Sequence, residues 1–119
     1  MRLNLLKSKI HRAVVTDADL NYEGSVSIDP TLIDAAHLFE FEKVDIYNCN
    51  NGARFSTYVI PGKKGEICLN GAAARHVQPG DLVIICCYAD FELEEAKNHQ
   101  PQLIFVGENN EIKSINQTK

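Results

Sequence analysis

A glycine–serine step is the first feature of this sequence that could support chemistry. Residues 21–25 read Asn-Tyr-Glu-Gly-Ser, so the hydroxyl of Ser25 follows directly after the carbonyl of Gly24. A glycine before a nucleophile leaves its carbonyl open to attack and lets the backbone adopt strained dihedral angles. By itself this step is typical of a flexible corner that leads into a strand, and a chemical role for it depends on the segments that accompany it.

Three further segments accompany this step, and each is ambiguous by itself. Arg54 lies beside a predicted hairpin, where an arginine is ordinarily solvated, and Tyr58 has the spacing of a half-buried strand residue. The small residues after Asn70 are typical of a tight turn. Only the combination and order of the segments point to a common function. They are Lys9 to Arg12, Asn51 to Tyr58 and Asn70 to Ala74.

Short strands separated by turns must position these groups. A single helix with a clear start is predicted over Thr31 to Leu38, because Asp29 can cap it and Pro30 suits its first residue. A second short helix is predicted at Leu93 to Asn98, and one helical turn after Asn70. The predicted strands are Leu3 to Val15 (one or two strands), Ser25 to Ile28, Lys43 to Asn48, Arg54 to Ile60, Ile67 to Leu69, Leu82 to Ala89 as a central strand, and Leu103 to Val106.

Turn residues punctuate the strands at short intervals. They lie at Asp17 to Asp19, Asn50 to Gly52, Pro61 to Gly65, Pro79 to Asp81 and Asn109 to Asn110, and the last residues are polar and expected to fray. The pattern predicts a mainly β domain of six to eight strands with two small helices, which a compact barrel would close.

Alternation along residues 54–60 divides their side chains between two faces. Arg54, Ser56 and Tyr58 share one face, whereas Thr57 lies on the other with its apolar neighbours. Any function that needs both Thr57 and Tyr58 at one site therefore requires a twist, a bulge or a neighbouring subunit.

Composition excludes several classes of protein. The 119 residues suit one domain, and 12 basic against 16 acidic residues, with no tryptophan, argue against a nucleic-acid-binding surface. No apolar run is long enough to span a membrane. The N-terminal segment does not resemble a signal peptide, so the cytoplasm is the expected location.

The cysteines and histidines lack the spacing of a metal site. Cys49, Cys68, Cys86 and Cys87 contain no CxxC pair, and we expect them to be buried small hydrophobic residues. Cys86 and Cys87 are adjacent in a strand and should point to opposite faces, so a redox pair would be strained. We expect no metal, and structural or surface positions for His37, His76 and His99.

Taken together, the motifs resemble the pyruvoyl-dependent aspartate 1-decarboxylases. The resemblance runs continuously from Leu5 to Ile85 and more loosely to Asn110, and it includes Gly80 to Ile85. It implies a double-psi β-barrel with short helices, assembled as a homotetramer with active sites between subunits. It also implies that the single domain, residues 1–119, cleaves itself between Gly24 and Ser25 into a beta chain (1–24) and an alpha chain (25–119).

The resemblance further implies a cofactor made from the chain. Ser25 would become a pyruvoyl group, which forms a Schiff base with L-aspartate and takes up electrons when the α-carboxylate leaves as CO2. The product, β-alanine, feeds pantothenate and coenzyme A synthesis. Pyridoxal phosphate normally supplies this electron sink, but the chain is short for such a domain and has no lysine in a recognisable context for it.

The same resemblance assigns roles to individual residues. Tyr58 would protonate the carbanion, and Thr57 would polarise the Gly24 carbonyl during processing and also contact substrate. Lys9 and Arg54 would bind the dicarboxylic substrate. Because the α-carboxylate must lose its charge, we expect the planar fork of Arg54 to hold the retained β-carboxylate. The other substrate-binding residues are Asn70, Gly71, Ala72 and Ala73, and the supporting residues are His11 and Tyr22.

Two parts of the chain depart from the family pattern. Cys86-Cys87 and the segment after Asp90 match nothing in it, which leaves open whether maturation needs an accessory protein. Two other functions also remain in view: a β-barrel binding or scaffold module that never cleaves, and a self-processing serine hydrolase with another substrate. The first is disfavoured by the complete set of motif residues, and the second does not explain Arg54 or the small residues after Asn70.

Overall fold

Strands dominate the fold. The computed structural model describes residues 1–116. Its strands are β1 (Arg2–Val14), β2 (Asp17–Asp19), β3 (Ser25–Ile28), β4 (Lys43–Asn48), β5 (Arg54–Pro61), β6 (Ile67–Asn70), β7 (Leu82–Glu92), β8 (Gln102–Val106) and β9 (Ile112–Ile115). Its helices are α1 (Pro30–Ala35) and α2 (Leu93–Ala96), with 3-10 turns η1 (Gly71–His76) and η2 (Glu108–Asn110).

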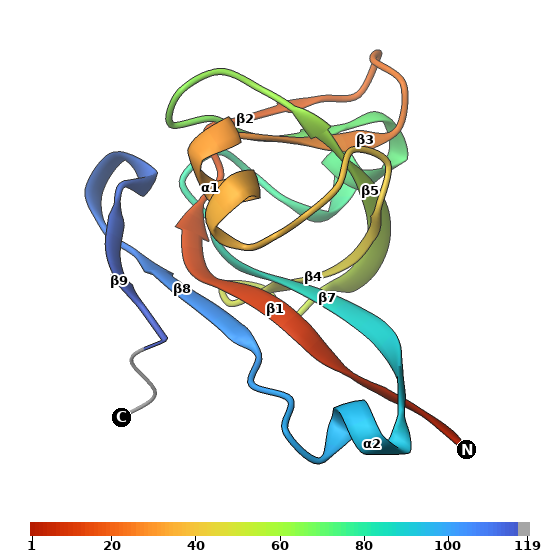
Figure 1. Cartoon of the computed structure of the whole chain (residues 1–119). Coiled ribbons are helices and arrows are strands. Elements are labelled where there is room, and N and C mark those ends of the chain that lie inside the picture. Colours follow the sequence, from red (N-terminus) through yellow and green to blue (C-terminus); the bar gives the residue numbers. More distant parts are fainter. Residues whose placement is uncertain (117–119) are drawn as a thin grey trace.

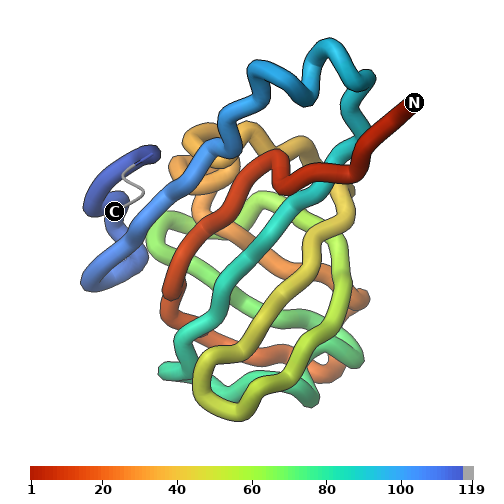
Figure 2. Tube along the Cα trace, turned by 90° about the horizontal axis from the view of Figure 1, so that it is seen from below, coloured from red at the N-terminus to blue at the C-terminus, as the bar shows by residue number. Residues whose placement is uncertain are grey.

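The strands wrap into a barrel. Their order is β2-β6-β3-β5-β4-β7-β1-β8-β9, and β1 runs directly into β2, which returns the chain to the first position of the order. Between them the Thr16 N–H donates to the Ile67 carbonyl at 2.8 Å. Figure 1 shows the barrel with β8 and β9 to one side, and Figure 2 shows the chain looping around a common centre. Because β1/β8, β2/β6 and β3/β5 pair in parallel while other pairs are antiparallel, the topology fits the expected double-psi β-barrel.

Aliphatic side chains fill the centre of the barrel. They alternate with polar residues along the strands, so the inner face of each strand supplies the core and the other face carries the polar groups. The buried members include Ile10, Val26, Ile28, Val44, Ile46, Val59, Ile67, Leu69, Val83 and Ile85.

The first helix begins where the sequence predicts. The Asp29 carboxylate accepts a hydrogen bond from the Thr31 N–H at 2.8 Å, and Pro30 is the first helical residue. The helix ends at Ala35 rather than Leu38, because His37 adopts a φ of 56° that no longer continues it. The second helix is likewise shorter than predicted, since it ends at Ala96.

Two of the sequence-based expectations for β structure are wrong. The predicted turn at residues 17–19 is strand β2, in which Ala18 lies opposite Leu69 of β6, because tertiary pairing overrides the turn preference of the two aspartates. Strand β9, which the sequence pattern did not predict, pairs with β8, Ile104 opposite Ile115. The expected fraying of the last residues falls on residues 117–119, outside the described part. The described chain therefore has nine strands rather than six to eight.

The other predicted elements are confirmed with small changes in length. Residues 43–48 and 54–61 form an antiparallel hairpin around Gly52, whose φ is 77°. The apolar run that starts at Leu82 forms β7, which lies between β4 and β1 and continues to Glu92. No helix within residues 1–116 combines the length and apolar character that crossing a membrane requires.

The cysteines are free, and three of the four are buried. Cys49 is exposed, contrary to expectation, because it follows β4 at the start of the hairpin turn. Cys87 packs in the core while Cys86 lines a surface hollow, which confirms that they point to opposite faces. Burial raises the pKa of the Cys87 thiol to about 12.

Three of the histidines lie at the surface or pack against aromatic rings. His37 is exposed after α1, and the ring of His76 stacks on Phe55 with centroids 4.7 Å apart. His99 packs on Phe91 at 4.2 Å between centroids.

Candidate active site

Ser25 is the first residue of β3, and its side chain is almost fully buried. It lies opposite Asn70 in the antiparallel pair β3/β6. Its Oγ accepts a hydrogen bond from Asn70 Nδ2 at 2.8 Å and donates to the Glu23 carbonyl at 3.1 Å. The hydroxyl is therefore held back over the Gly24–Ser25 peptide rather than directed into solvent.

Gly71 packs directly against the segment that contains the predicted cleavage position. Its φ is 64°, and a Cβ placed on it would lie 2.7 Å from both N and Cα of Gly24 and 3.0 Å from the Tyr22 carbonyl oxygen. Gly24 itself is outside the left-handed region, and a Cβ there would have no neighbour within 4 Å. Neither the φ angle nor the space at Gly24 requires a glycine, and the backbone requirement for glycine lies at Gly71.

The register between β3 and β5 resolves the conflict between Thr57 and Tyr58. These strands run parallel with Val26 opposite Val59. Extending that register backwards puts Ser25 level with Tyr58 and Gly24 level with Thr57. The two side chains occupy opposite faces of β5, and in this extended register each residue is level with one residue of the glycine–serine step.

Lys9 and Arg54 lie on a second part of the surface. Cross-strand pairing places Lys9 opposite Cys86 and Cys86 opposite Asp45, in one row across β1, β7 and β4. Arg54 pairs with Tyr47 in the next row, and its guanidinium lies 4.1 Å from the centroid of the Tyr47 ring. This face of the sheet therefore carries both cations predicted to bind substrate.

Three charged side chains of this face, Lys9, Asp45 and Arg54, each shift the pKa of the Cys86 thiol. Burial raises the pKa of the Cys86 thiol, and Asp45 adds to that effect, whereas the charges of Lys9 and Arg54 lower it. All three charged groups are thus close enough to influence one sulfur.

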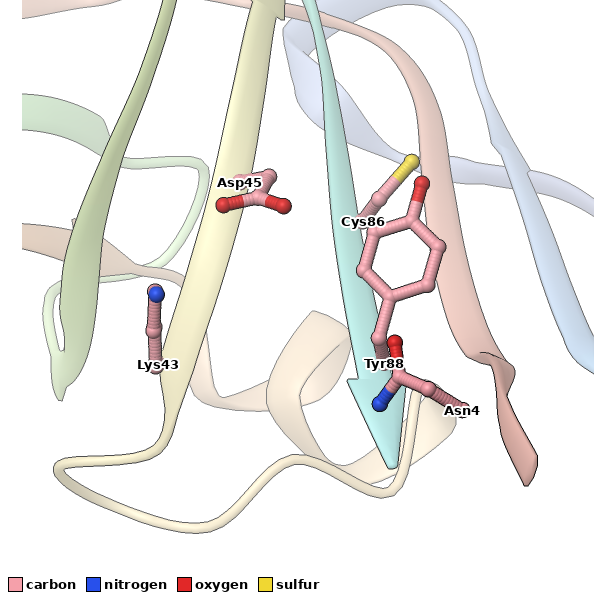
Figure 3. A pocket seen from close by; sticks show the side chains of 5 residues that line it. All are labelled: Asn4, Lys43, Asp45, Cys86 and Tyr88. Atoms are coloured by element: carbon pink, nitrogen blue, oxygen red, sulfur yellow. The ribbon is translucent and has the colours of Figure 1, made fainter. Parts of the chain in front are cut away.

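Two shallow hollows adjoin one another on this face. The first, of about 200 Å³, is shown in Figure 3: Lys43 and Asp45 come from β4, Cys86 and Tyr88 from β7, and Asn4 from β1. The second, of about 220 Å³, shares Asp45 with the first and contains Arg54. Its other lining residues are Tyr47, Phe55 and Ser56.

The two parts of the candidate site are separated within one chain. Arg54 and Tyr58 are four residues apart on β5, which corresponds to about 13 Å along an extended strand. The structure thus brings Gly24, Ser25, Asn70 and Gly71 together beside Tyr58, and it does not bring Lys9 or Arg54 into contact with them.

The remaining predicted residues lie around these two parts. His11 is half-buried edge-on to Phe105, with ring centroids 5.3 Å apart, and burial together with Lys9 and Arg12 lowers its pKa. Tyr22 is 55% exposed, so its main chain rather than its ring is fixed against Gly71. Within η1, Ala73 is buried and Ala72 is exposed.

Sequence reasoning missed two polar residues of this site. Asn70 Nδ2 also donates to Ser27 Oγ at 3.0 Å, and the Cys68 thiol donates to Asn70 Oδ1 at 3.2 Å. The alternation of polar and apolar residues in Ser-Val-Ser-Ile could have identified Ser27, since it shares a face with Ser25. Nothing in the sequence distinguishes Cys68 from an ordinary buried cysteine.

Comparison with known proteins places this geometry in a family. Residues 1–113 match the family model described as aspartate decarboxylase. The chain is 69% identical over 112 residues to an aspartate 1-decarboxylase of Bdellovibrio bacteriovorus, covering 94% of this chain and 90% of that protein. It is 62% identical to the Clostridium botulinum enzyme of the same name (97% and 94% covered) and 55% identical to that of Ralstonia pickettii (99% and 100%). The chain belongs to the aspartate decarboxylase family.

Proposed function

We propose that this chain decarboxylates L-aspartate at the α-carboxylate to form β-alanine and CO2, a step in pantothenate and coenzyme A biosynthesis. The observation that carries the proposal is the environment of Ser25, whose hydroxyl is buried, held by Asn70, and adjacent to a glycine carbonyl. Similar enzymes that carry the name aspartate 1-decarboxylase, which match nearly the whole chain, support the choice of substrate.

Self-cleavage at Gly24–Ser25 is the first part of the proposed mechanism. Ser25 Oγ attacks the Gly24 carbonyl carbon, the peptide C–N bond breaks, and the freed amine takes up the hydroxyl proton, which leaves an ester. Loss of the Ser25 α-proton then expels the Gly24 carboxylate and forms dehydroalanine. Water adds and ammonia leaves, so residue 25 ends as a pyruvoyl group at the start of the 25–119 chain.

The surroundings of residue 25 suit such a group. Asn70 Nδ2, which donates to Ser25 Oγ in the intact chain, lies beside residue 25 and would be available to donate to a ketone oxygen there, and Gly71 leaves room for the backbone to approach. When present, the ketone condenses with the substrate amine and accepts the electron pair released as CO2 leaves. No pyridoxal phosphate or metal is part of the proposal.

Thr57 and Tyr58 act at the two residues of the processed bond. In the extended register of β3 and β5, Thr57 is level with Gly24, which supports its assignment as the hydroxyl that polarises the Gly24 carbonyl. We also assign Thr57 a contact with the substrate. Tyr58, level with Ser25, is assigned as the proton donor to the carbanion. The short segment that contains Gly71, Ala72 and Ala73 would pack against the substrate from the other side.

Arg54 and Lys9 bind the carboxylates of the substrate. Arg54 is assigned to the β-carboxylate, because a tight clamp on the α-carboxylate would oppose its conversion to neutral CO2. His11 supports this part of the site: with Lys9 and Arg12 beside it, its lowered pKa favours the neutral ring near pH 7. Tyr22 is assigned a supporting position beside residue 25.

A neighbouring copy of the chain completes the site in this proposal. The roughly 13 Å between Arg54 and Tyr58 along β5 supports the view that one subunit supplies the cations and another supplies residue 25. We propose a homotetramer in the cytoplasm, a location that suits four free cysteines. Whether an accessory protein assists cleavage is decided by whether the purified chain matures alone.

Mass spectrometry of the denatured protein tests this function. Two fragments that end at Gly24 and begin at residue 25, the larger with a blocked pyruvoyl terminus, are expected together with β-alanine production from L-aspartate. A single unmodified chain that remains intact in cell extract would instead favour a non-catalytic barrel. Two fragments that release no β-alanine would favour a self-processing protein with another substrate.

A further inference from the structure

We infer that Cys68 is a positioning residue for self-cleavage, because its thiol helps to set the orientation of the Asn70 side-chain amide toward Ser25. This inference rests on the proposed cleavage at Gly24–Ser25. The thiol does not touch the reacting atoms, since its hydrogen bond goes to Asn70 Oδ1 at 3.2 Å. It acts through the amide, whose Nδ2 lies 2.8 Å from Ser25 Oγ.

Four polar side chains form a small buried network. Ser25, Ser27, Cys68 and Asn70 are 1%, 8%, 6% and 3% exposed, respectively. The two serines and the cysteine contact different atoms of the amide: the serine oxygens take hydrogen bonds from Nδ2, and the thiol gives one to Oδ1. Because buried polar groups lose free energy when unpaired, this network favours a single arrangement.

The cysteine favours one of the two orientations of the amide. A hydroxyl can donate or accept, so Ser27 could pair with either Nδ2 or Oδ1 of a rotated Asn70, whereas Ser25 could do so only by giving up its hydrogen bond to the Glu23 carbonyl. The protonated thiol of Cys68 donates to Oδ1, and it would lose that bond and face the N–H2 group if the amide were turned over. Cys68 therefore adds to the preference for Nδ2 toward Ser25.

The thiol stays protonated in this environment. Burial, together with the charges of Asp17, Glu66 and Asp19, raises the pKa of Cys68 to about 11. The thiol thus remains a donor to Asn70 Oδ1 over the whole range in which the protein would function.

The orientation matters to the nucleophile. With Nδ2 toward it, Ser25 Oγ directs its own hydrogen to the Glu23 carbonyl, and the amide N–H stabilises the negative charge that Oγ carries when it loses its proton, before it bonds to the Gly24 carbonyl carbon. With the amide reversed, Oδ1 would take the Ser25 hydrogen and face that charge with its own negative end. Cleavage would then be slower although the fold is unchanged.

Matched substitutions at two buried cysteines test the inference. Cys68→Val removes the donor at similar volume, Cys68→Ser keeps a donor, and Cys87→Val removes a thiol that has no contact with Asn70. Freshly purified precursor is followed by mass spectrometry, and urea unfolding verifies that each variant is folded. Cys68→Ala serves in place of Cys68→Val if that variant fails to fold.

The expected result is a selective loss of cleavage rate. Cys68→Val should cleave about tenfold more slowly than wild type, because the free energy of one neutral hydrogen bond corresponds to about this change in rate. The cleavage rates of Cys68→Ser and Cys87→Val should stay within about twofold of the wild-type rate. The inference is overturned if Cys68→Val keeps the wild-type rate, or if Cys68→Ser is as slow as Cys68→Val.

A second measurement separates this inference from the proposed function. If the wild-type chain never cleaves, the proposed function fails, but the Asn70 amide can still be observed by NMR in the intact chain. Its two hydrogens should exchange with water at similar slow rates in wild type and Cys68→Ser, and faster in Cys68→Val. Equal exchange in all three would overturn the role of Cys68 independently of cleavage.

Discussion

The substitution Gly71→Ala tests whether the close packing of Gly71 against Gly24 positions the segment of the proposed cleavage. The added Cβ would lie 2.7 Å from N and Cα of Gly24, whereas ordinary van der Waals contact begins at 3.4 Å, so the backbone must shift by about 0.7 Å. These two atoms and the Tyr22 carbonyl oxygen, 3.0 Å away, all belong to the main chain, so no side-chain rotation can relieve the overlap. The substitution therefore acts directly on the residue whose carbonyl is attacked in the proposed cleavage.

Two costs contribute to the expected loss of stability. A residue with a side chain at a φ of 64° costs roughly 1–2 kcal/mol, and overpacking adds about 1–3 kcal/mol, which predicts roughly 2–5 kcal/mol for Gly71→Ala. Gly52→Ala is the matched control, because its φ is 77° and a Cβ there has no neighbour within 4 Å. The free energy of unfolding of Gly52→Ala should fall only by the conformational cost of the positive φ, about 1–2 kcal/mol.

The assays are urea unfolding at fixed protein concentration and the rate of precursor cleavage by mass spectrometry. A displacement near 1 Å at a reacting group costs on the order of a hundredfold in rate, so Gly71→Ala should cleave at least about tenfold more slowly. Gly52→Ala should cleave at the wild-type rate. If Gly71→Ala matches Gly52→Ala in both measurements, the close packing of Gly71 on Gly24 is not what positions the cleavage segment.

Four further predictions concern the site and the stability of the fold. Tyr58→Phe should leave cleavage intact but lower turnover by about 10²–10⁴-fold, and a full-speed variant would exclude proton donation by this residue. Arg54→Lys should lose activity on aspartate without gaining any on analogues that lack the β-carboxylate charge; equal losses on both substrates would contradict a β-carboxylate clamp. Burial raises the pKa of Glu42, but hydrogen bonds from Lys7 and the neighbouring main chain outweigh that effect, so the pKa lies below the usual value for a glutamate, and the stabilisation is present above that usual value and lost on acidification. Glu42→Gln should thus be less stable than wild type near pH 7, and the difference in stability should narrow as the pH falls through the lowered pKa; a constant difference would show that the ion pair is not responsible. Iodoacetamide at about pH 8 should label Cys49 alone in the native protein, since the other thiols are buried, and rapid labelling of a second cysteine would contradict that burial.

Local patterns predicted most of the strands and the course of the first helix. Alternation located β3, β4 and β5, and Asp29 with Pro30 located the start of α1, because strand periodicity and helix capping depend on neighbours in the sequence. The same reasoning was wrong at residues 17–19. Their aspartates favour a turn, and only the parallel partner β6, some fifty residues away, makes them a strand.

The candidate site divides in the same way. The types of residue at Ser25, Arg54 and Tyr58, and their order along the chain, are sequence properties and were enough to identify the family motif. Neighbours in the sequence could not predict the packing of Gly71 on Gly24, because it depends on η1 lying beside the segment before β3. Nor could they predict the contact of Cys68 with the amide that faces Ser25, because it depends on β6 pairing with β3.

The sequence by itself determined the chemical groups, the mainly β character of the chain and its resemblance to a family, because these depend on residue type and on spacing over a few residues. Tertiary structure decided which groups meet. The parallel register of β3 and β5, extended back from Val26 opposite Val59, puts Tyr58 level with Ser25 and Thr57 level with Gly24, and the antiparallel register of β3 and β6 brings Asn70 opposite Ser25. The extended conformation of β5 also separates Arg54 from Tyr58 by about 13 Å. Such registers are set by packing across the barrel between distant segments, which no local pattern encodes.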